Sequence, residues 1–225
     1  MTSVRVSVVG GTGALGSGLA FRLARAGHTV SIGSRDAARA AEAAKALAVT
    51  TGSDLVSGTD NRASAAAADI VFVTVPFASQ RQTLKDIAEV VAGKIVVDTT
   101  VPLVPPKVAR VQLPPEGSAA AIAAAVLGEG VRLVTAFHNI SAHKLGKDAD
   151  PGCDVLVFGD EIEARNEVVA LTNGLGIRAL HGGPLANAVA AEAMTSLLIA
   201  INKRYKVSDG AGISITGIAP DALID

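Results

Sequence analysis

Three glycines near the start of the chain are spaced in a way that suits a bound pyrophosphate. Gly11, Gly13 and Gly16 form a Gly-x-Gly-x-x-Gly pattern directly after the apolar, β-branched run 4–9. Gly11 permits a tight turn, Gly13 lets the backbone approach an anion, and Gly16 lets the following helix press against the strand. That helix, predicted over 15–26, directs free N–H groups and the positive end of its dipole at the same point. The spacing therefore predicts a phosphate site.

The glycine pattern alone is weak evidence, because 23 glycines in 225 residues produce some matches by chance. Its context strengthens it. The glycines follow a predicted strand and precede a helical stretch, and a second β-branched run follows at 28–33. This strand–turn–helix–strand order is the unit in which dinucleotides bind.

The end of the second β-branched run indicates which dinucleotide is bound. Proteins that use NAD generally place Asp or Glu there, where the carboxylate accepts a hydrogen bond from the ribose 2′-hydroxyl. This chain has Ser34 and Arg35, and Arg39 lies one helical turn further on. A hydroxyl and guanidinium groups suit a 2′-phosphate, which a carboxylate would repel. We therefore expect NADP; solvated surface arginines are the alternative.

The composition narrows the class of protein. With 49% hydrophobic residues the chain can bury a large core, and its net charge of −1 offers no basic face for nucleic acid or anionic lipid. The lone Cys153 rules out a disulfide framework within the chain, and the four histidines follow no metal-binding spacing, so no metal is expected. No signal-peptide pattern or uninterrupted apolar run of membrane-spanning length is present. We expect a cytoplasmic protein without nucleic-acid or membrane partners.

Strand-like and helix-like patterns alternate along the chain, which predicts an α/β fold of the Rossmann type with a doubly wound, mostly parallel sheet. We expect an NADP-binding domain over 1–147 and, over 148–225, a small C-terminal lobe or an extension of the sheet. Strands are predicted at 69–75, 94–98, 131–137, 154–158, 176–180 and 212–216, and helices at 36–48, 63–68, 80–91, 118–127, 161–173 and 185–204.

Two of the predicted strands deliver residues to the carboxyl edge of the sheet, where ligands of such sheets bind. Strand 69–75 ends at Val75 and Pro76, which we expect to border the cofactor, and strand 131–137 brings His138 to the same edge. Between them, the loop 102–117 holds five of the nine prolines. A loop of this length is typical of a binding wall or lid, although a passive crossover is the alternative.

Two enzyme classes that share the glycine pattern do not fit. A short-chain dehydrogenase needs a Tyr-x-x-x-Lys pair, but the sole tyrosine, Tyr205, has Asp209 at that offset. Hydroxyacid and imine reductases add a large helical substrate domain, for which the residues after 147 are too few. A second substrate should therefore dock against the sheet edge itself.

The chain resembles a known family, the NADPH-dependent reductases of the deazaflavin coenzyme F420. The resemblance covers most of the chain, and AFHNISA with the downstream GPL and INKRYK is its most specific part. It is carried by GGTGALGSGLAFRLARAGH (10–28), IGSR (32–35), GKIVVDTTVPL (93–103), EGSAA (116–120), VTAFHNISAHKL (134–145), GPLANA (183–188) and INKRYK (201–206).

The resemblance implies direct hydride transfer between C4 of the nicotinamide and C5 of the deazaflavin. Such a transfer needs alignment of two carriers and no catalytic acid or base. The resemblance places Gly11, Thr12, Gly13 and Leu15 on the pyrophosphate, Ser34, Arg35 and Arg39 on the 2′-phosphate, Pro76 and Ala136 at the nicotinamide, and His138 and Ile140 at the deazaflavin.

Two other functions stay open at this point: an NADPH-dependent reductase of free flavin or ferric complexes on the same scaffold, and an NADP-sensing module without catalysis. The C-terminal lobe is expected to complete the deazaflavin crevice. The long apolar helix at 185–204 is also a candidate contact for a homodimer.

Overall fold

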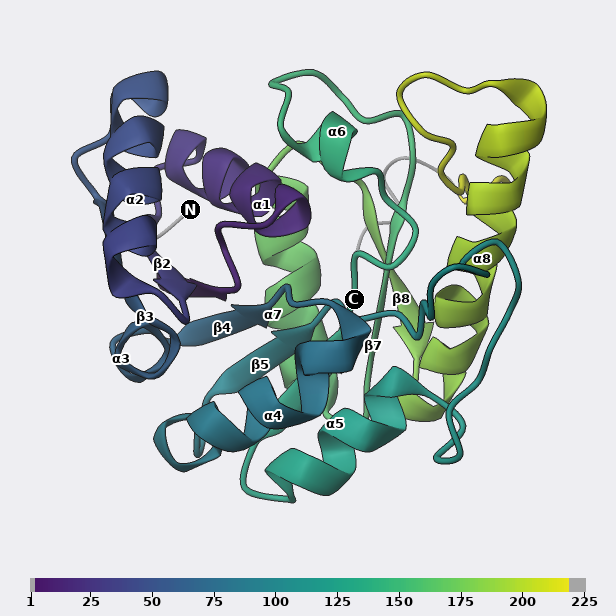
Figure 1. Ribbon diagram of the computed structural model, residues 1–225, viewed down its shortest axis with the longest axis horizontal. Coiled ribbons are helices and arrows are strands. Elements are labelled where there is room, and N and C mark those ends of the chain that lie inside the picture. Colours follow the sequence, from purple (N-terminus) through teal and green to yellow (C-terminus); the bar gives the residue numbers. More distant parts are fainter. Residues whose placement is uncertain (1–2, 219–225) are drawn as a thin grey trace.

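Residues 3–218 are described by a computed structural model, in which they form an eight-stranded sheet with helices on both faces (Figure 1). The strands are β1 (Arg5–Val9), β2 (Thr29–Ser34), β3 (Val56–Asp60), β4 (Ile70–Val73), β5 (Ile95–Asp98), β6 (Arg132–Thr135), β7 (Val155–Gly159) and β8 (Ala179–Gly183). Their order is β3-β2-β1-β4-β5-β6-β7-β8, and all neighbours are parallel except β6 and β7. The predicted mostly parallel α/β fold is confirmed.

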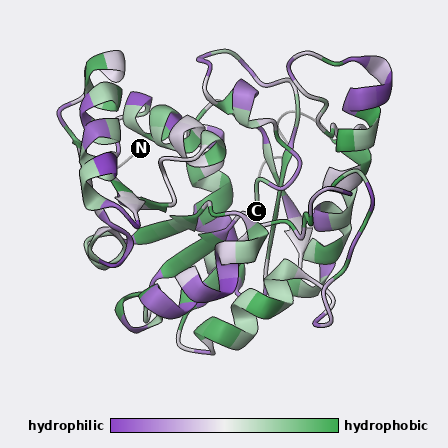
Figure 2. Cartoon of the chain, viewed as in Figure 1, coloured by the Kyte–Doolittle hydropathy of each residue, from purple (hydrophilic) through white to green (hydrophobic). Residues whose placement is uncertain are grey.

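The helices cover the two faces of the sheet. They are α1 (Ala14–Arg25), α2 (Ala37–Thr51), α3 (Asn61–Ala66), α4 (Phe77–Ile87), α5 (Ala119–Leu127), α6 (Ala142–Leu145), α7 (Ile162–Gly174) and α8 (Ala188–Tyr205). Helices α1, α2 and α7 pack on one face, whereas α3, α4 and α5 pack on the other. Strands β4 and β5 are buried on both sides for this reason, and Figure 2 shows β4 as hydrophobic along its length, whereas β5 is apolar up to Asp98 at its end.

Successive strands of the chain are added first on one side of β1 and then, from β4 onward, on its other side. Strands β1 to β3 extend the sheet to one side, and β4 to β6 extend it to the other. In open parallel sheets a crevice forms at such a reversal, beyond the carboxyl ends of the two strands. The fold therefore opens a cleft where the glycine turn after β1 meets the segment after β4.

Beyond residue 147, strands β7 and β8 extend the same sheet. Strand β7 pairs antiparallel with β6, with Phe158 opposite Thr135, and β8 adds in parallel to β7. Helix α8 packs its Ala188 and Ala191 against Phe158 and against Ala120 of α5. Of the two alternatives for this region, the observed one is a sheet extension carrying two further helices.

Several element boundaries differ from the prediction. The strand predicted at 212–216 is wrong: this segment is extended, but its backbone bonds to Asp154 through Ile213 O and Ile215 N and joins no strand. The strand predicted at 176–180 begins later, at Ala179, since Gly176 turns the chain with a positive φ. Strand β3 and the short helix α6 were not predicted, because neither contains an apolar periodic run.

One segment, Leu185–Tyr205, is long and apolar enough by length and composition to cross a membrane, which the sequence analysis did not expect. In the folded chain it comprises a single 3-10 turn and α8. Its Glu192 is buried and bonds to α5, and its Thr195 bonds to the backbone at His138. The helix is therefore fastened to the sheet along one side.

Candidate active site

The turn between β1 and α1 is tight because glycines occupy the positions that exclude a side chain. Gly10 has a φ of +76° and is the residue that needs the left-handed conformation. Gly11 donates its N–H to Val8 O and Gly33 O, both at 3.0 Å. A Cβ on Gly16 would lie 2.5 Å from Thr74 Oγ1, so this glycine lets α1 close against the end of β4.

The N-terminus of α1 has no side-chain cap. Its N-cap residue is Gly13, so no hydroxyl or carboxylate accepts from the first turn. A Cβ on Gly13 would contact only Gly10 O, at 3.4 Å, which is an ordinary contact. The protein itself therefore leaves space and free N–H groups here, which is the arrangement that binds an anion.

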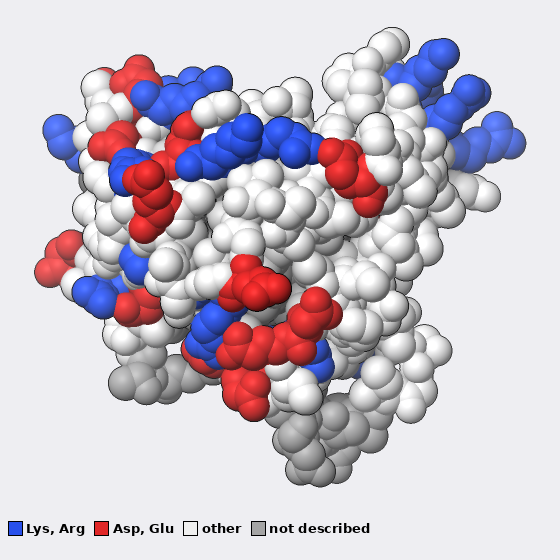
Figure 3. All heavy atoms as spheres, turned by 90° about the horizontal axis from the view of Figure 1, so that it is seen from below, with Lys and Arg blue, Asp and Glu red and all other residues white. Residues whose placement is uncertain are grey.

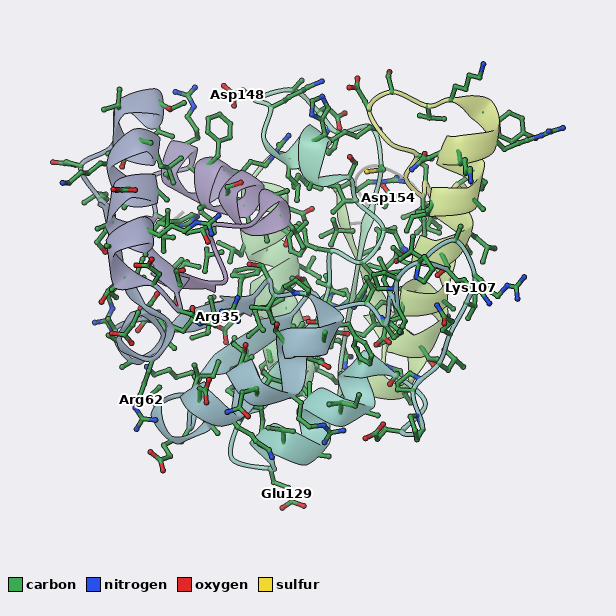
Figure 4. The ribbon with its side chains drawn as sticks, viewed as in Figure 1. Arg35, Arg62, Lys107, Glu129, Asp148 and Asp154 are labelled. Carbon is green, nitrogen blue, oxygen red and sulfur yellow. The ribbon has the colours of Figure 1, made fainter. Side chains whose placement is uncertain are left out.

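Two arginines lie beside the end of β2. Figure 4 labels Arg35 there. Asp36, the nearest acid, accepts hydrogen bonds from Ala38 N and Arg39 N and so caps α2 instead of pairing with an arginine. Within residues 3–218 none of the ion pairs involves Arg35 or Arg39. Both arginine side chains are exposed, so their guanidinium groups can bind an anion.

One cleft joins the glycine turn, the end of β2 and the start of α4. Pro76 is the N-cap of α4, and the side chain of Val75 lies against Gly10. The cleft is lined by Gly10, Thr12, Gly13, Ser34, Arg35, Arg39, Asn61, Thr74, Val75, Pro76, Ser79 and Thr83.

The end of β6 carries the second predicted group of site residues at the same carboxyl edge. Phe137 has a φ of +64°, rare for a residue with a side chain, and its ring packs edge-on against Phe72 at 5.8 Å between centroids. Only β5 separates β6 from β4, so Pro76 and His138 lie at ends of strands about 10 Å apart, two inter-strand spacings.

His138 is buried without a hydrogen-bond partner. Its side chain is near the ring of Phe158, with 6.0 Å between centroids, and neither Nδ1 nor Nε2 has a partner in the described chain. Burial lowers the pKa of His138 to about 4, so its imidazole is neutral. Unpartnered buried nitrogens cost free energy, and they are available to a ligand that reaches them.

The segment after His138 is fastened to α1 by Arg22. The buried guanidinium of Arg22 donates to five backbone carbonyls, including Leu145 O at 3.0 Å and Ala149 O at 2.6 Å. Gly18 leaves room for Leu145, since a Cβ there would lie 2.8 Å from it. These contacts anchor residues 144–149 to α1, a few residues beyond Ile140, which is also buried.

Asp98, at the end of β5, is a buried carboxyl between the two ligand-facing strand ends. It accepts from Thr100 N at 3.1 Å and Thr100 Oγ1 at 2.6 Å, and from Gln80 Nε2. Burial raises the pKa of Asp98 to about 6, against the opposite effect of these hydrogen bonds. The carboxyl thus supports the turn after β5 and does not face the cleft.

Comparison with known proteins connects this geometry to one family. A family model described as NADP oxidoreductase, coenzyme F420-dependent, matches residues 5–102. The F420-dependent NADP reductase of Methanothermobacter thermautotrophicus is 42% identical over 96% of this chain and 96% of its own length. That of Methanocaldococcus jannaschii is 38% identical over 96% of this chain and 99% of its own.

The chain belongs to this family. The family, the NADP-dependent oxidoreductase class and the cofactor pair predicted from the sequence are therefore confirmed, and the flavin, ferric and sensor alternatives are not favoured. A provisionally assigned F420-dependent NADP reductase from Arthrobacter sp. FB24 has the same fold, with a TM-score of 0.81 and 25% identity over 95% of this chain and 100% of that one.

The predicted site residues of this F420-dependent reductase fall into two groups. Thr12, Gly13, Ser34, Arg35, Arg39, Val75 and Pro76 line the cleft, whereas Gly11, Leu15, Gly16, Ala136, His138 and Ile140 do not. Gly11 and Gly16 are buried in the turn, and the other four pack into the protein core or its margin. The proline-rich loop 102–117 also lies outside this cleft; it runs along α8, and Ser196 Oγ donates to Arg110 O at 3.4 Å.

Sequence reasoning missed part of the cleft lining. Asn61 accepts from Gly10 N at 3.3 Å and enters the cleft at the start of α3, directly after the unpredicted β3. Ser79 and Thr83 come from α4, one turn apart on one face. Thr74 could have been found, because it lies next to the end of the predicted strand 69–75.

Proposed function

We propose that hydride passes directly between C4 of the NADP nicotinamide and C5 of the F420 deazaflavin, at the sheet edge between the ends of β4 and β6. The observation that carries the proposal is the presence, along one edge, of an uncapped helix N-terminus and of a buried histidine whose ring nitrogens have no hydrogen-bond partner within residues 3–218. The first suits a phosphate, and the second suits a polar ring held in an apolar wall.

At the NADP end, the backbone from Gly11 to Leu15 would bind the pyrophosphate, with Gly16 closing the turn behind it. Ser34, Arg35 and Arg39 would bind the 2′-phosphate. Local contacts support this placement. Ser34 Oγ lies beside the N-cap of α2, where it accepts from Asp36 N at 3.2 Å, and no ion pair among residues 3–218 involves the guanidinium group of Arg35 or Arg39. Charge-assisted bonds to phosphate are among the strongest available to a surface site.

The nicotinamide would lie against Val75, Pro76 and Ala136, and the deazaflavin against His138 and Ile140. A neutral imidazole keeps one N–H donor and one acceptor, so His138 can donate to a ring carbonyl without introducing a charge. Both ring nitrogens are covered by the protein beside Phe158, so binding of the deazaflavin would require the ring or its cover to move before a nitrogen gains its partner.

The reaction chemistry resides in the two coenzymes, one donating and one accepting a hydride. The protein would contribute binding, orientation and exclusion of water. Holding two carriers face to face converts a bimolecular reaction into an effectively intramolecular one, which accounts for a large share of enzymatic acceleration. No acid or base on this chain needs to touch the reacting carbons.

Residues 148–225 would complete the deazaflavin side of the crevice. Helix α8 supports this, because Asn139 Nδ2 donates to Ala191 O at 2.8 Å and Thr195 Oγ1 donates to His138 O at 2.8 Å. The opposite side of α8 exposes Met194, Leu197, Ile201 and Tyr205. A second copy of the chain would cover this stripe in a symmetric homodimer, which light scattering of the purified protein would detect.

The test of the proposed function is reduction of F420 by NADPH. Purified protein with NADPH should bleach the visible absorbance of oxidised F420, and NADH should support the reaction poorly. Free flavin and ferric citrate are the control acceptors. Oxidation of NADPH with either control acceptor, but not with F420, would replace the proposal with a flavin or ferric reductase.

A further inference from the structure

A buried glutamate of α8 joins two parts of the protein that are distant in sequence. Glu192 is 1% exposed, and its carboxylate accepts from Ala119 N at 2.7 Å and from Ala120 N at 2.9 Å. Both N–H groups belong to the first turn of α5, and Ser118 Oγ accepts a third, from Ala121 N. An anionic side chain at a helix N-terminus is favoured by the free N–H groups and the helix dipole.

The same turn of α8 holds the acceptor wall. Asn139 Nδ2 donates to Ala191 O and to Thr195 Oγ1, and the Thr195 hydroxyl donates to His138 O. Residues 191–195 therefore bond to α5 on one side and to the 138–139 segment on the other. Figure 1 shows α8 running alongside the sheet with α5 at its lower end. A shift of this turn would be transmitted to His138 directly through the Thr195 hydrogen bond and indirectly through the two bonds of Asn139.

Glu192 belongs to a connected buried network. Gln80 Nε2 donates to Ala119 O at 2.9 Å and to the carboxyl of Asp98, so α4, α5 and β5 meet next to Glu192. Burial raises the pKa of Glu192 to about 7, and the nearby charge of Asp98 contributes in the same direction. The other titratable groups on the surrounding elements are the buried His138 and a set of exposed residues. The exposed ones are Lys85, Asp86 and Arg81 on α4, of which Arg81 pairs with Glu116, and Lys203, Arg204 and Tyr205 near the end of α8.

Protonation of Glu192 would change its bonding. A carboxylate accepts two N–H groups equally well, one on each oxygen. A protonated carboxyl keeps one good acceptor, its carbonyl oxygen. Its hydroxyl oxygen is a poor acceptor for the second N–H group. The link between α8 and α5 would therefore weaken by about one charge-assisted hydrogen bond.

We propose that Glu192 is a positioning residue for the hydride acceptor: its carboxylate clamps α8 to α5 and thereby holds His138 in the wall that receives the deazaflavin. This inference rests on the proposed function of His138 and Ile140. Glu192 touches neither coenzyme in this account and acts only through the turn 191–195.

The test compares the wild type with Glu192→Gln over a range of pH. Both enzymes are measured with the same coenzyme, so any effect of F420 ionisation on KM cancels in the ratio of their two KM values. We expect the variant's KM to be about tenfold higher at about pH 8, where the wild type carries the carboxylate, and the two values to converge at about pH 5.5. The KM for NADPH should change less than about twofold. The matched control is Glu163→Gln, an exposed acid on α7.

Three results would overturn the role of Glu192: a KM ratio that does not vary with pH, an equal change in the KM for NADPH, or a control that behaves like Glu192→Gln. Because the variant could fail to fold, a second measurement uses the wild type alone. The amide resonances of Ala119 and Ala120 should titrate near pH 7, whereas that of Ala121, bonded to Ser118, should titrate much less. Equal shifts of all three amide resonances over this range would overturn the clamp, because the change at Glu192 would then not act through its two bonded N–H groups.

These outcomes separate the two proposals. A wild type that never reduces F420 at any pH would overturn the proposed function, and with it the acceptor role of the wall. A wild type that reduces F420 with normal kinetics, together with a Glu192→Gln enzyme of the same pH profile, would overturn the positioning role alone.

Discussion

The two ends of the proposed hydride path are built in opposite ways. The NADP end consists of backbone and exposed cations: the uncapped start of α1, the left-handed Gly10, and the guanidinium groups of Arg35 and Arg39. The acceptor end consists of buried polar side chains, among them His138 and Glu192. The first is assembled from neighbours in sequence, whereas the second depends on hydrogen bonds between residues 52 to 73 positions apart.

This difference predicts how each end responds to its surroundings. Arg35 and Arg39 at the NADP end are exposed, as are the described charged side chains of both signs on the face drawn in Figure 3, so solvent and salt can screen them. At the acceptor end, burial raises the pKa of Asp98 and Glu192 and lowers that of His138. Changes of pH should therefore act mainly on the deazaflavin side, and changes of salt on the NADP side.

The largest expected effect is at the backbone site. Gly13→Val should abolish NADPH binding, because the branched side chain would occupy the place of the pyrophosphate against the N–H groups of α1. The fold should survive, since a Cβ at Gly13 meets only Gly10 O at an ordinary distance. Calorimetry with NADPH checks this, with Gly130→Val, at an open loop position, as the control. Normal affinity in the folded variant would show that the turn binds no phosphate.

The contrast between the two ends also explains how far the sequence could predict the structure. The glycine turn and the residues around Arg35 are local patterns, and β1 and β4 are rich in β-branched apolar residues, so these were predicted. Asn61 was missed because it follows β3, whose residues Val-Ser-Gly-Thr-Asp give no strand pattern and are held by pairing with β2. Ile213 and Ile215 are spaced as in a strand, but they bond to one residue instead of a neighbouring strand. Ile213 O accepts from Asp154 N, and Ile215 N donates to the Asp154 carboxylate.

The buried polar residues of the acceptor end could not be assigned from sequence for a related reason. Gln80 and Glu192 lie in helices where polar residues are usually exposed. Their burial follows only from the packing of α4, α5 and α8 around the ends of β5 and β6. His138 was found through the motif around it, but its lack of partners is visible only in the folded chain.

The next largest effect tests the buried carboxyls. The folded state holds the proton on Asp98 more tightly than the unfolded chain does, so stability should fall as pH rises from 3.8 to about 6. The pKa difference corresponds to about 3 kcal/mol. Asp98→Asn removes the charge and keeps an acceptor for Thr100. The free energy of unfolding of the variant, measured with urea, should therefore increase relative to that of the wild type by up to about 3 kcal/mol between about pH 4 and pH 7. A difference that does not change with pH would contradict the raised pKa.

A smaller effect is expected for the exposed cations of the NADP end. Arg35→Ala should raise the KM for NADPH roughly tenfold to a hundredfold, the loss of a charge-assisted bond of about 1.5–3 kcal/mol, and leave that for NADH nearly unchanged. Added salt should reduce the difference. Arg62→Ala, which removes a surface arginine paired with Glu89, is the control. An equal effect on both coenzymes would show that Arg35 does not bind the 2′-phosphate.

The smallest effect concerns His138, and it distinguishes the two ends most directly. His138→Ala should weaken F420 binding or slow hydride transfer by one hydrogen bond, about 1–2 kcal/mol or roughly five- to thirtyfold, while NADPH affinity stays within about twofold. Because alanine also leaves a cavity beside Phe158, His138→Phe is the sharper variant: it fills the space and removes both unpartnered nitrogens. Replacing an unpartnered buried polar ring with an apolar one should leave the free protein at least as stable. Stopped-flow reduction of F420 at saturating NADPH measures the effect. Unchanged KM and rate in both variants would mean that the acceptor wall binds the deazaflavin by shape alone, and that the nitrogens of His138 have no part in it.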